Sequence, residues 1–164
     1  MSSETIVLSC RSTVHGGNRL LAGHNGNGAV GFGTDGHDNT HWSRTIEIVK
    51  GQQVWTLRCL DTFNPNHAFL DGRTQDGSVG LAPNASKTFS GTRWLAHDLG
   101  GGEVALECLG TFKNANFVFL DGRPGNGTVG LAPTTKPPFS GTRWFVDRPS
   151  VPIDFGSNNV PASD

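Results

Sequence analysis

The chain has 164 residues and a mass of 17.4 kDa, which suits one well-buried domain and is too short for two ordinary ones. Thirteen basic and fourteen acidic side chains give a formal net charge of −1, so no long-range field attracts a polyanion and we expect no nucleic-acid partner. No apolar run reaches the ~20 residues of a transmembrane helix, so we also expect no membrane insertion.

Residues 1–5 have neither the basic start nor the apolar run of a secretory signal peptide. This favours a cytoplasmic location, or secretion without a visible signal peptide. The composition indicates nothing about the oligomeric state, which stays unknown at this point.

A sequence repeat covers most of the chain. The phrase FLDGRTQDGSVGLAPNASKTFSGTRW spans residues 69–94, and FLDGRPGNGTVGLAPTTKPPFSGTRW spans residues 119–144. A less similar copy lies in the first third, where LAGH at 21–24 aligns with the two LDGR segments. We therefore predict a single domain over residues 1–148 that is built from three repeats. The predicted repeats span about 5–53, 54–102 and 103–148.

Each repeat opens with apolar residues at every second position, which is the period of a strand with one buried face. These inward rows are Ile6/Leu8/Cys10, Trp55/Leu57/Cys59 and Val104/Leu106/Cys108. The cysteines recur at intervals of 49 residues, and an odd set cannot all pair within one chain. We therefore expect three buried, reduced thiols that serve packing.

The rest of each repeat is predicted to hold three further strands. The second strand ends at Leu21, Leu70 or Leu120, and a glycine-bearing turn leads into the third. The fourth strand holds a repeated tryptophan, whose ring we expect to fill the core rather than to stack on a ligand. The three tryptophans are Trp42, Trp94 and Trp144. No segment shows helical periodicity, so the predicted fold class is all-β.

The last stretch, residues 149–164, has three prolines and polar closing residues. We predict a C-terminal tail that docks through Val151, Ile153 and Phe155.

Together these features resemble the β-trefoil superfamily over residues 5–148: four short strands per repeat, a core Leu in strand two, Val-x-Leu in strand three and Gly-x-x-Trp at strand four. Ricin-B lectins end each repeat in Gln-x-Trp, and the aligned positions here are Thr40, Thr92 and Thr142. The glycine-rich lead at 100–102 is closer to fascin and hisactophilin, the actin-crosslinking-like type. The resemblance implies a β-trefoil with pseudo-threefold symmetry, of lectin-like or actin-crosslinking-like type.

The doubled LDGR phrase supplies four candidate ligand-binding residues: Asp71, Arg73, Asp121 and Arg123. Each Asp follows an inward Leu, so we expect it to point outward at the mouth of a hairpin. A carboxylate accepts hydrogen bonds from two neighbouring sugar hydroxyls, and an arginine donates to further oxygens. The first repeat has Ala22 and His24 instead, which predicts two equivalent sites and one divergent one.

A structural role explains the same pattern almost as well. An Asp before Gly in a tight turn accepts hydrogen bonds from backbone N–H groups two residues on. It can also pair with the arginine of the GTRW segment in the same repeat, which is Arg93 or Arg143.

Residues 35–41 of the first repeat hold two histidines and two aspartates, which are ligand types for a transition metal. Because a glycine-containing loop does not fix ligand geometry, a solvated polar loop is the favoured interpretation. We predict no metal site and no other cofactor.

No catalytic arrangement is evident. Ser90 and Ser140 lie in no Gly-x-Ser-x-Gly segment and have no nearby histidine. Asp71 and Asp121 belong to different repeats, so they are too far apart for the carboxylate pair of a glycosidase. We therefore expect no enzymatic activity.

The leading hypothesis is a non-catalytic, lectin-like carbohydrate-binding protein that is multivalent through its hairpin sites, with glycans or glycoproteins as partners. One alternative is a protein-binding trefoil of the actin-crosslinking type. Another is a trefoil protease inhibitor, whose best candidate loop is residues 134–138.

Overall fold

The computed structural model describes residues 3–11, 20–24, 26–33, 38–60, 64–123 and 127–148. These residues hold twelve strands and three short 3₁₀ helices. The strands are β1 (Ser3–Cys10), β2 (Leu20–His24), β3 (Ala29–Gly33), β4 (Trp42–Val49), β5 (Gln52–Cys59), β6 (Phe69–Arg73), β7 (Ser78–Ala82), β8 (Trp94–Gly100), β9 (Glu103–Cys108), β10 (Phe119–Arg123), β11 (Thr128–Ala132) and β12 (Trp144–Asp147). The 3₁₀ helices are η1 (Asp38–Thr40), η2 (Lys87–Thr92) and η3 (Ser140–Thr142).

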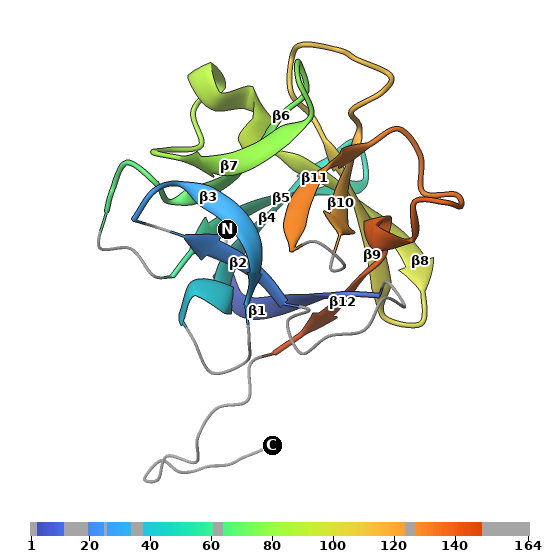
Figure 1. Ribbon diagram of the computed structural model, residues 1–164, viewed down its shortest axis with the longest axis horizontal. Helices are drawn as coiled ribbons and strands as arrows, with labels where there is room; N and C mark the ends of the chain where they lie inside the picture. The colour runs from blue at the N-terminus through green and yellow to red at the C-terminus, as the bar shows by residue number, and fades with distance from the viewer. Residues whose placement is uncertain are drawn as a thin grey trace, which may run out of the picture.

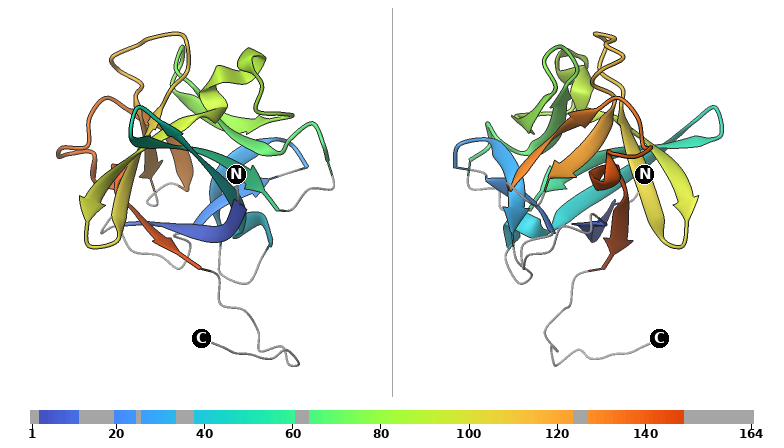
Figure 2. Two further views of the ribbon diagram at one scale, coloured as in Figure 1. Left: turned by 180° about the vertical axis from the view of Figure 1, so that it is seen from behind. Right: turned by 45° about the vertical axis from the view of Figure 1, so that its right-hand side comes forward.

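Six of the strands close a barrel. Antiparallel pairing runs from β1 to β4, β5, β8, β9 and β12, and β12 pairs again with β1. The other six strands form three hairpins that pair with one another through β3, β7 and β11 and so cap the barrel. Figures 1 and 2 show this arrangement. A six-stranded barrel with a cap of three hairpins is a β-trefoil, so the predicted all-β fold is confirmed.

The strands fall into three groups in chain order, which we call unit 1 (β1–β4), unit 2 (β5–β8) and unit 3 (β9–β12). The first and fourth strands of each unit contribute to the barrel, and the second and third form its cap hairpin. Each hairpin is therefore held on a rigid base, which is the usual support for a binding site.

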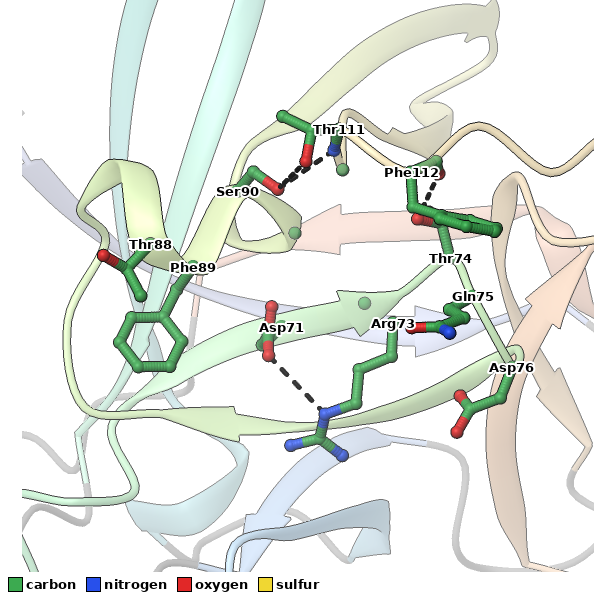
Figure 3. Close-up of a pocket in the computed structure, with 13 residues that line it drawn as sticks. Asp71, Arg73, Thr74, Gln75, Asp76, Thr88, Phe89, Ser90, Thr111 and Phe112 are labelled. Carbon is green, nitrogen blue, oxygen red and sulfur yellow. Dashed lines mark hydrogen bonds and ion pairs between the residues drawn. The ribbon is translucent and has the colours of Figure 1, made fainter.

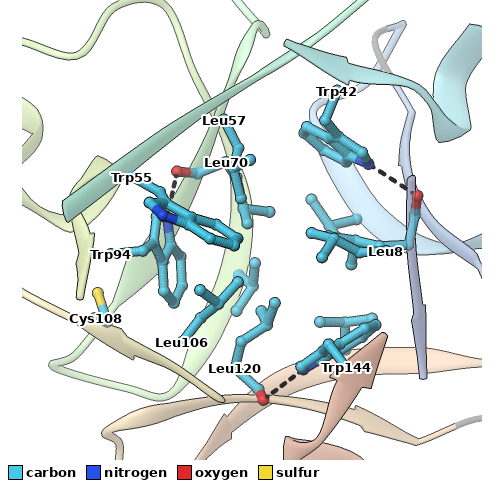
Figure 4. Close-up of a cluster of buried hydrophobic side chains, with 14 of the residues drawn as sticks. Leu8, Trp42, Trp55, Leu57, Leu70, Trp94, Leu106, Cys108, Leu120 and Trp144 are labelled. Carbon is cyan, nitrogen blue, oxygen red and sulfur yellow. Dashed lines mark hydrogen bonds between the residues drawn. The ribbon is translucent and has the colours of Figure 1, made fainter. Parts of the chain in front are cut away.

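The tryptophans lie in the core, as predicted. Trp42, Trp94 and Trp144 are fully buried. Their indole N–H groups donate to the carbonyl oxygens of Leu21, Leu70 and Leu120 at 3.0, 3.1 and 3.1 Å, and Figure 4 shows these bonds. Because the donors are satisfied inside the protein, these rings do not contact a ligand. Trp55 is also buried, as its inward position predicts.

The predicted end of the second strand was wrong. The strand continues past Leu70, because Asp71 pairs with Gly80 and Arg73 pairs with Ser78 across the hairpin. The same pairing in unit 3 places Asp121 opposite Gly130. The turn comes later, and it ends at Gly77, whose φ of 82° suits glycine. The candidate Asp and Arg residues are therefore strand residues and not turn residues.

The cysteines are buried thiols, which confirms the prediction. Cys108 of unit 3 lies beneath the hairpin of unit 2, and its Sγ donates to the carbonyl of Gly72 at 3.4 Å. A Cβ at Gly72 would lie 2.8 Å from both this Sγ and the Trp94 ring, so only glycine fits. Burial raises the pKa of the Cys108 thiol to about 11, which keeps it protonated and unreactive at neutral pH.

Three predictions fall on residues outside the described ranges. They concern the tail at 149–164, its docking residues Val151, Ile153 and Phe155, and the segment 35–37 of the His/Asp loop. Among the described residues, no helix has the length and apolar composition needed to cross a membrane.

Candidate functional site

A pocket of about 310 Å³ lies where unit 2 meets unit 3. The β6–β7 hairpin forms one wall, η2 forms a second, and the connection between β9 and β10 forms the third. Figure 3 shows its side chains. The lining side chains are Asp71, Arg73, Thr74, Gln75, Asp76, Thr88, Phe89, Ser90, Thr111 and Phe112. Two of the four predicted site residues therefore lie in one pocket.

Asp71 and Asp121 lie on the side of the strand away from the core, as expected, but they are covered, since only 8% and 4% of their surfaces are exposed. Leu70 does face the core, and the opposite side of β6 is covered by η2. Gly91 of η2 lies so close that an added Cβ would be 1.9 Å from the Gly72 carbonyl and 2.6 Å from Asp71 Oδ1. Alternation predicted the direction of the carboxylate but not the 3₁₀ helix that covers it.

The Asp71 carboxylate is buried without a hydrogen bond from any residue that the structure describes. Its nearest cation is Arg73, whose Nε lies 3.7 Å from Asp71 Oδ2. Burial raises the pKa of Asp71 above its ordinary value of 3.8, and the Arg73 charge only partly opposes this. Because the Asp71 carboxylate accepts no hydrogen bond from the described residues, its oxygens can accept hydrogen bonds from a ligand in the pocket that Asp71 lines.

The counterpart carboxylate in unit 3 has a hydrogen bond that Asp71 lacks. Arg123 Nε donates to Asp121 Oδ2 at 3.1 Å, so this carboxylate already has a hydrogen bond within the protein. Burial again raises the pKa of Asp121 above 3.8. Gly141 covers Asp121 as Gly91 covers Asp71.

Both structural roles considered for these aspartates were wrong. Arg93 pairs with Glu47 at 3.1 Å, and Arg143 pairs with Glu103 at 3.3 Å, so neither arginine holds the aspartate of its own repeat. The turn is capped by Asp76, which accepts from the backbone N–H of Ser78 at 3.0 Å and from its hydroxyl at 2.7 Å. These hydrogen bonds lower the pKa of Asp76.

Hydroxyl groups attach the unit 3 connection to unit 2. Ser90 Oγ accepts from the backbone N–H of Thr111 at 3.0 Å and lies 3.3 Å from its hydroxyl. Thr74 Oγ1 donates to the backbone carbonyl of Phe112 at 2.5 Å. The third wall of the pocket is therefore fixed in place, and Ser90 does more than form a turn.

Two aromatic rings lie on opposite sides of Asp71 in Figure 3. Phe112 is 53% exposed, which is unusual for a large apolar side chain, and Phe89 is half-buried. An exposed aromatic ring and a buried carboxylate that line the same pocket are a combination that suits partly apolar, hydroxylated ligands.

Sequence reasoning missed Thr111 and Phe112 because they belong to the next repeat. A signal was present, since Leu-Asp-Thr-Phe at 60–63 and Leu-Gly-Thr-Phe at 109–112 share three of four residues. This match outside the predicted hairpins indicates that the segment after the first strand is part of the repeated pattern.

Unit 1 has no equivalent of the Asp71 carboxylate. Ala22 replaces the aspartate, and Asn39 stands where Gly91 stands in unit 2. The Asn39 Oδ1 is buried and lies 3.8 Å from where a Cβ on Gly33 would be. Within the described part of the chain, no three His, Cys, Asp or Glu side chains are grouped so that they can hold a metal ion.

A second pocket, of about 450 Å³, lies on the barrel between the β4–β5 and β8–β9 hairpins and β12. Arg44 stacks over the Trp55 ring at 4.6 Å there and pairs with Glu4 at 2.6 Å. Glu103, also in this pocket, is held by Arg11 and Arg143. Because these charges are already paired, the Asp71 pocket is the stronger candidate site.

Comparison with known proteins agrees with the fold. No protein-family model matches the chain, and no curated protein sequence is similar to it. Among solved structures, it is similar to SeviL bound to asialo-GM1 saccharide, with 16% identity, a TM-score of 0.60, and coverage of 88% of this chain and 96% of that one. It is also similar to ThreeFoil, a designed 3-fold symmetric protein, with 20% identity, a TM-score of 0.61, and coverage of 87% and 97%.

A third similar structure is the GlcNAcα1-4Gal-releasing endo-β-galactosidase from Clostridium perfringens, with 14% identity and a TM-score of 0.61. The match covers 90% of this chain but 33% of that enzyme. At these identities the similarity concerns the backbone fold. The chain is thus a β-trefoil, and one of its structural neighbours, SeviL, is bound to a saccharide.

Proposed function

We propose that this protein is a non-catalytic, lectin-like carbohydrate-binding protein that binds sugar in the Asp71 pocket. The observation that carries the proposal is the Asp71 carboxylate, which is buried, makes no hydrogen bond to the described residues and lines a pocket. A buried charged group without a hydrogen bond costs free energy, so such groups are found where a ligand supplies the missing donors.

A sugar supplies these donors well. Two neighbouring hydroxyl groups of a pyranose can donate to one carboxylate, and each charge-assisted bond contributes about 1.5–3 kcal/mol. Arg73 and the hydroxyl-bearing residues at the rim offer further polar contacts, and Phe112 offers an apolar surface for the C–H groups of the ring. SeviL, whose fold is similar, has been solved with asialo-GM1 saccharide bound, and this supports the proposal.

Multivalency is part of the proposal, with a second site at Asp121 and Arg123. These residues repeat the strand position, the burial and the ion pair of the first site. Two weak sites on one chain raise the overall affinity for a surface that carries many sugars. Glycans and glycoproteins are therefore the proposed partners.

We propose no catalytic activity. Hydrolysis of a glycosidic bond needs a second carboxylate about 5 to 9.5 Å from the first across the bound sugar. The other carboxylate of this pocket, Asp76, is already bonded to Ser78 in the hairpin turn. We expect no release of nitrophenol from a panel of nitrophenyl glycosides, and steady release would contradict this part of the proposal.

A glycan array tests the function directly. The wild-type protein is compared with the double variant Asp71→Asn/Asp121→Asn, and the control is Asp98→Asn/Asp147→Asn on barrel strands β8 and β12. We expect array signals for the wild type and the control, and their loss in the Asp71/Asp121 variant while the melting temperature changes by less than about 3 °C. Either a wild type without signals or a double variant that keeps them would overturn the proposal.

A further inference from the structure

The chain leaves the first strand of each unit beside the buried tryptophan of another unit: unit 2 beside unit 1, unit 3 beside unit 2, and unit 1 beside unit 3. The backbone N–H groups of Leu109, Leu60 and Arg11 donate at 2.9–3.0 Å to the residue that precedes the buried tryptophan of another strand. These three residues therefore occupy corresponding positions in the three units. Residues 61–63 and 12–19, which follow two of them, lie outside the described ranges.

The cysteine just before each of these residues shows the same correspondence between units. Cys108 Sγ donates to the carbonyls of Gly72 and Gly91 beneath the unit 2 hairpin. Cys10 Sγ donates to the carbonyls of Gly122 and Gly141 beneath the unit 3 hairpin. The site of Asp71 is thus completed by residues that follow Cys108, and the chain leaves Cys10 beneath the Asp121 hairpin at the corresponding point.

The sequences that follow Leu109 and Arg11 differ from each other. Three positions beyond Leu109 the sequence has Phe112, and three positions beyond Arg11 it has Val14. In the sequence that follows Cys59 of unit 2 this position is Phe63, but the unit 1 hairpin above Cys59 has Ala22 in place of the aspartate. One combination of hairpin and following segment therefore has both the carboxylate and the aromatic ring.

The carboxylates differ as well. The Arg73 Nε to Asp71 Oδ2 distance is 3.7 Å, whereas Arg123 Nε donates to Asp121 Oδ2 at 3.1 Å. A sugar hydroxyl that binds Asp121 competes with an existing hydrogen bond, and one that binds Asp71 does not. Both differences favour tighter sugar binding in the Asp71 pocket than at Asp121.

Resting on the proposed function, we infer that the two sites are unequal and that the Asp71 pocket, completed by Phe112 of the next unit, is the dominant site. Phe112 is its specificity-determining residue, because it selects pyranoses with one apolar face. The pocket holds about 310 Å³, which is at the small end for a ligand site and suits one terminal ring.

The charges in the pocket narrow the ligand class further. Among the described residues that line it, the ionisable groups are two carboxyl groups, Asp71 and Asp76, and one guanidinium, Arg73. An acidic sugar brings a third carboxylate or a sulfate into this group, and the like charges repel. The dominant ligand is therefore an uncharged terminal pyranose.

Calorimetric titration tests the inference with five probes: the methyl glycosides of galactose, glucose, mannose, N-acetylgalactosamine and N-acetylneuraminic acid. We expect one of the four neutral glycosides to bind more tightly than the acidic one. With that probe, Asp71→Asn lowers the affinity of the dominant site about tenfold, and Asp121→Asn lowers it less than twofold.

Phe112→Val copies into the unit 2 site the residue found in the segment after Cys10. We expect about a three- to tenfold loss of affinity for the same probe, with unchanged melting temperature. Ile48→Val, an exposed change on β4, is the control and leaves affinity unchanged. Equal losses from Asp71→Asn and Asp121→Asn, or no loss from Phe112→Val, would overturn the inference while leaving carbohydrate binding intact. Absence of binding by all five glycosides together with an empty glycan array would remove the proposed function and the inference with it.

Discussion

The hairpins of unit 1 and unit 2 share one scaffold and differ in what they can bind. In both, a buried tryptophan donates to the carbonyl of the leucine in the second strand, from Trp42 to Leu21 and from Trp94 to Leu70. In both, a cysteine from the next unit lies below the hairpin. Above the hairpin the resemblance ends, because unit 2 has a carboxylate under a glycine and unit 1 has Ala22 and Asn39.

This difference distinguishes the residues of each repeat that stabilise the fold from those that we expect to bind a ligand. The contacts below the hairpin build the core and are kept in both units, so they are structural. The residues above it change together: when the aspartate is present the covering residue is Gly91, and when it is absent the covering residue is Asn39. The polar groups above the hairpin are therefore where we expect function, and the predictions below test each side of this comparison.

The largest expected effect comes from adding a methyl group to the cover of unit 2. In Gly91→Ala the new Cβ lies 1.9 Å from the Gly72 carbonyl, so η2 must move away from β6. We expect a loss of about 3 kcal/mol of unfolding free energy in urea denaturation. Asn39→Ala at the matching position of unit 1 should cost less than about 1 kcal/mol. Equal stability of Gly91→Ala and wild type would show that η2 does not cover Asp71 closely.

A smaller loss is expected from Trp94→Phe. The change removes the 3.1 Å hydrogen bond to the Leu70 carbonyl and leaves a buried acceptor unsatisfied. We expect a cost of about 2 kcal/mol. Since Trp42 has the same role, Trp42→Phe should cost the same within about 0.5 kcal/mol. A clear difference between the two, measured by urea denaturation, would contradict the view that the scaffold is shared.

The pH dependence of stability gives the smallest effect. A carboxyl group whose pKa is raised in the folded state binds its proton more tightly when folded. Its contribution to stability is therefore complete below pH 3.8 and is lost as the pH rises through the raised pKa. Relative to Asp71→Asn/Asp121→Asn, the wild type should lose stability as the pH is raised stepwise above 3.8. A relative gain over this range, in urea denaturation at each pH, would mean that these carboxylates are well solvated or strongly paired.

The fold could be predicted from the sequence because its determinants repeat at short range. The alternation of Trp55, Leu57 and Cys59 indicates a strand with one buried face, and the recurrence of the same row in each repeat indicates three equivalent units. The core position of Trp94 followed from the same reasoning and is confirmed.

The site could be predicted only in part, because its geometry depends on contacts between repeats. Asp71 was identified, but its burial under η2 was not, since Gly91 gives no signal that it will pack on a strand twenty residues earlier. Phe112 was missed because it belongs to another repeat and joins the site only through folding. The position of Arg73 beside Asp71 follows from strand pairing that continues beyond the predicted end.

The most direct test of the account is an NMR titration that follows backbone amide and indole N–H signals as the best neutral methyl glycoside is added. We predict that the largest shifts occur at Gly91, Thr111 and Phe112, which surround the Asp71 pocket. The indole N–H of Trp55, in the second pocket, should remain unchanged. The largest shifts at Trp55 and Arg44, with none at Thr111 and Phe112, would contradict the account.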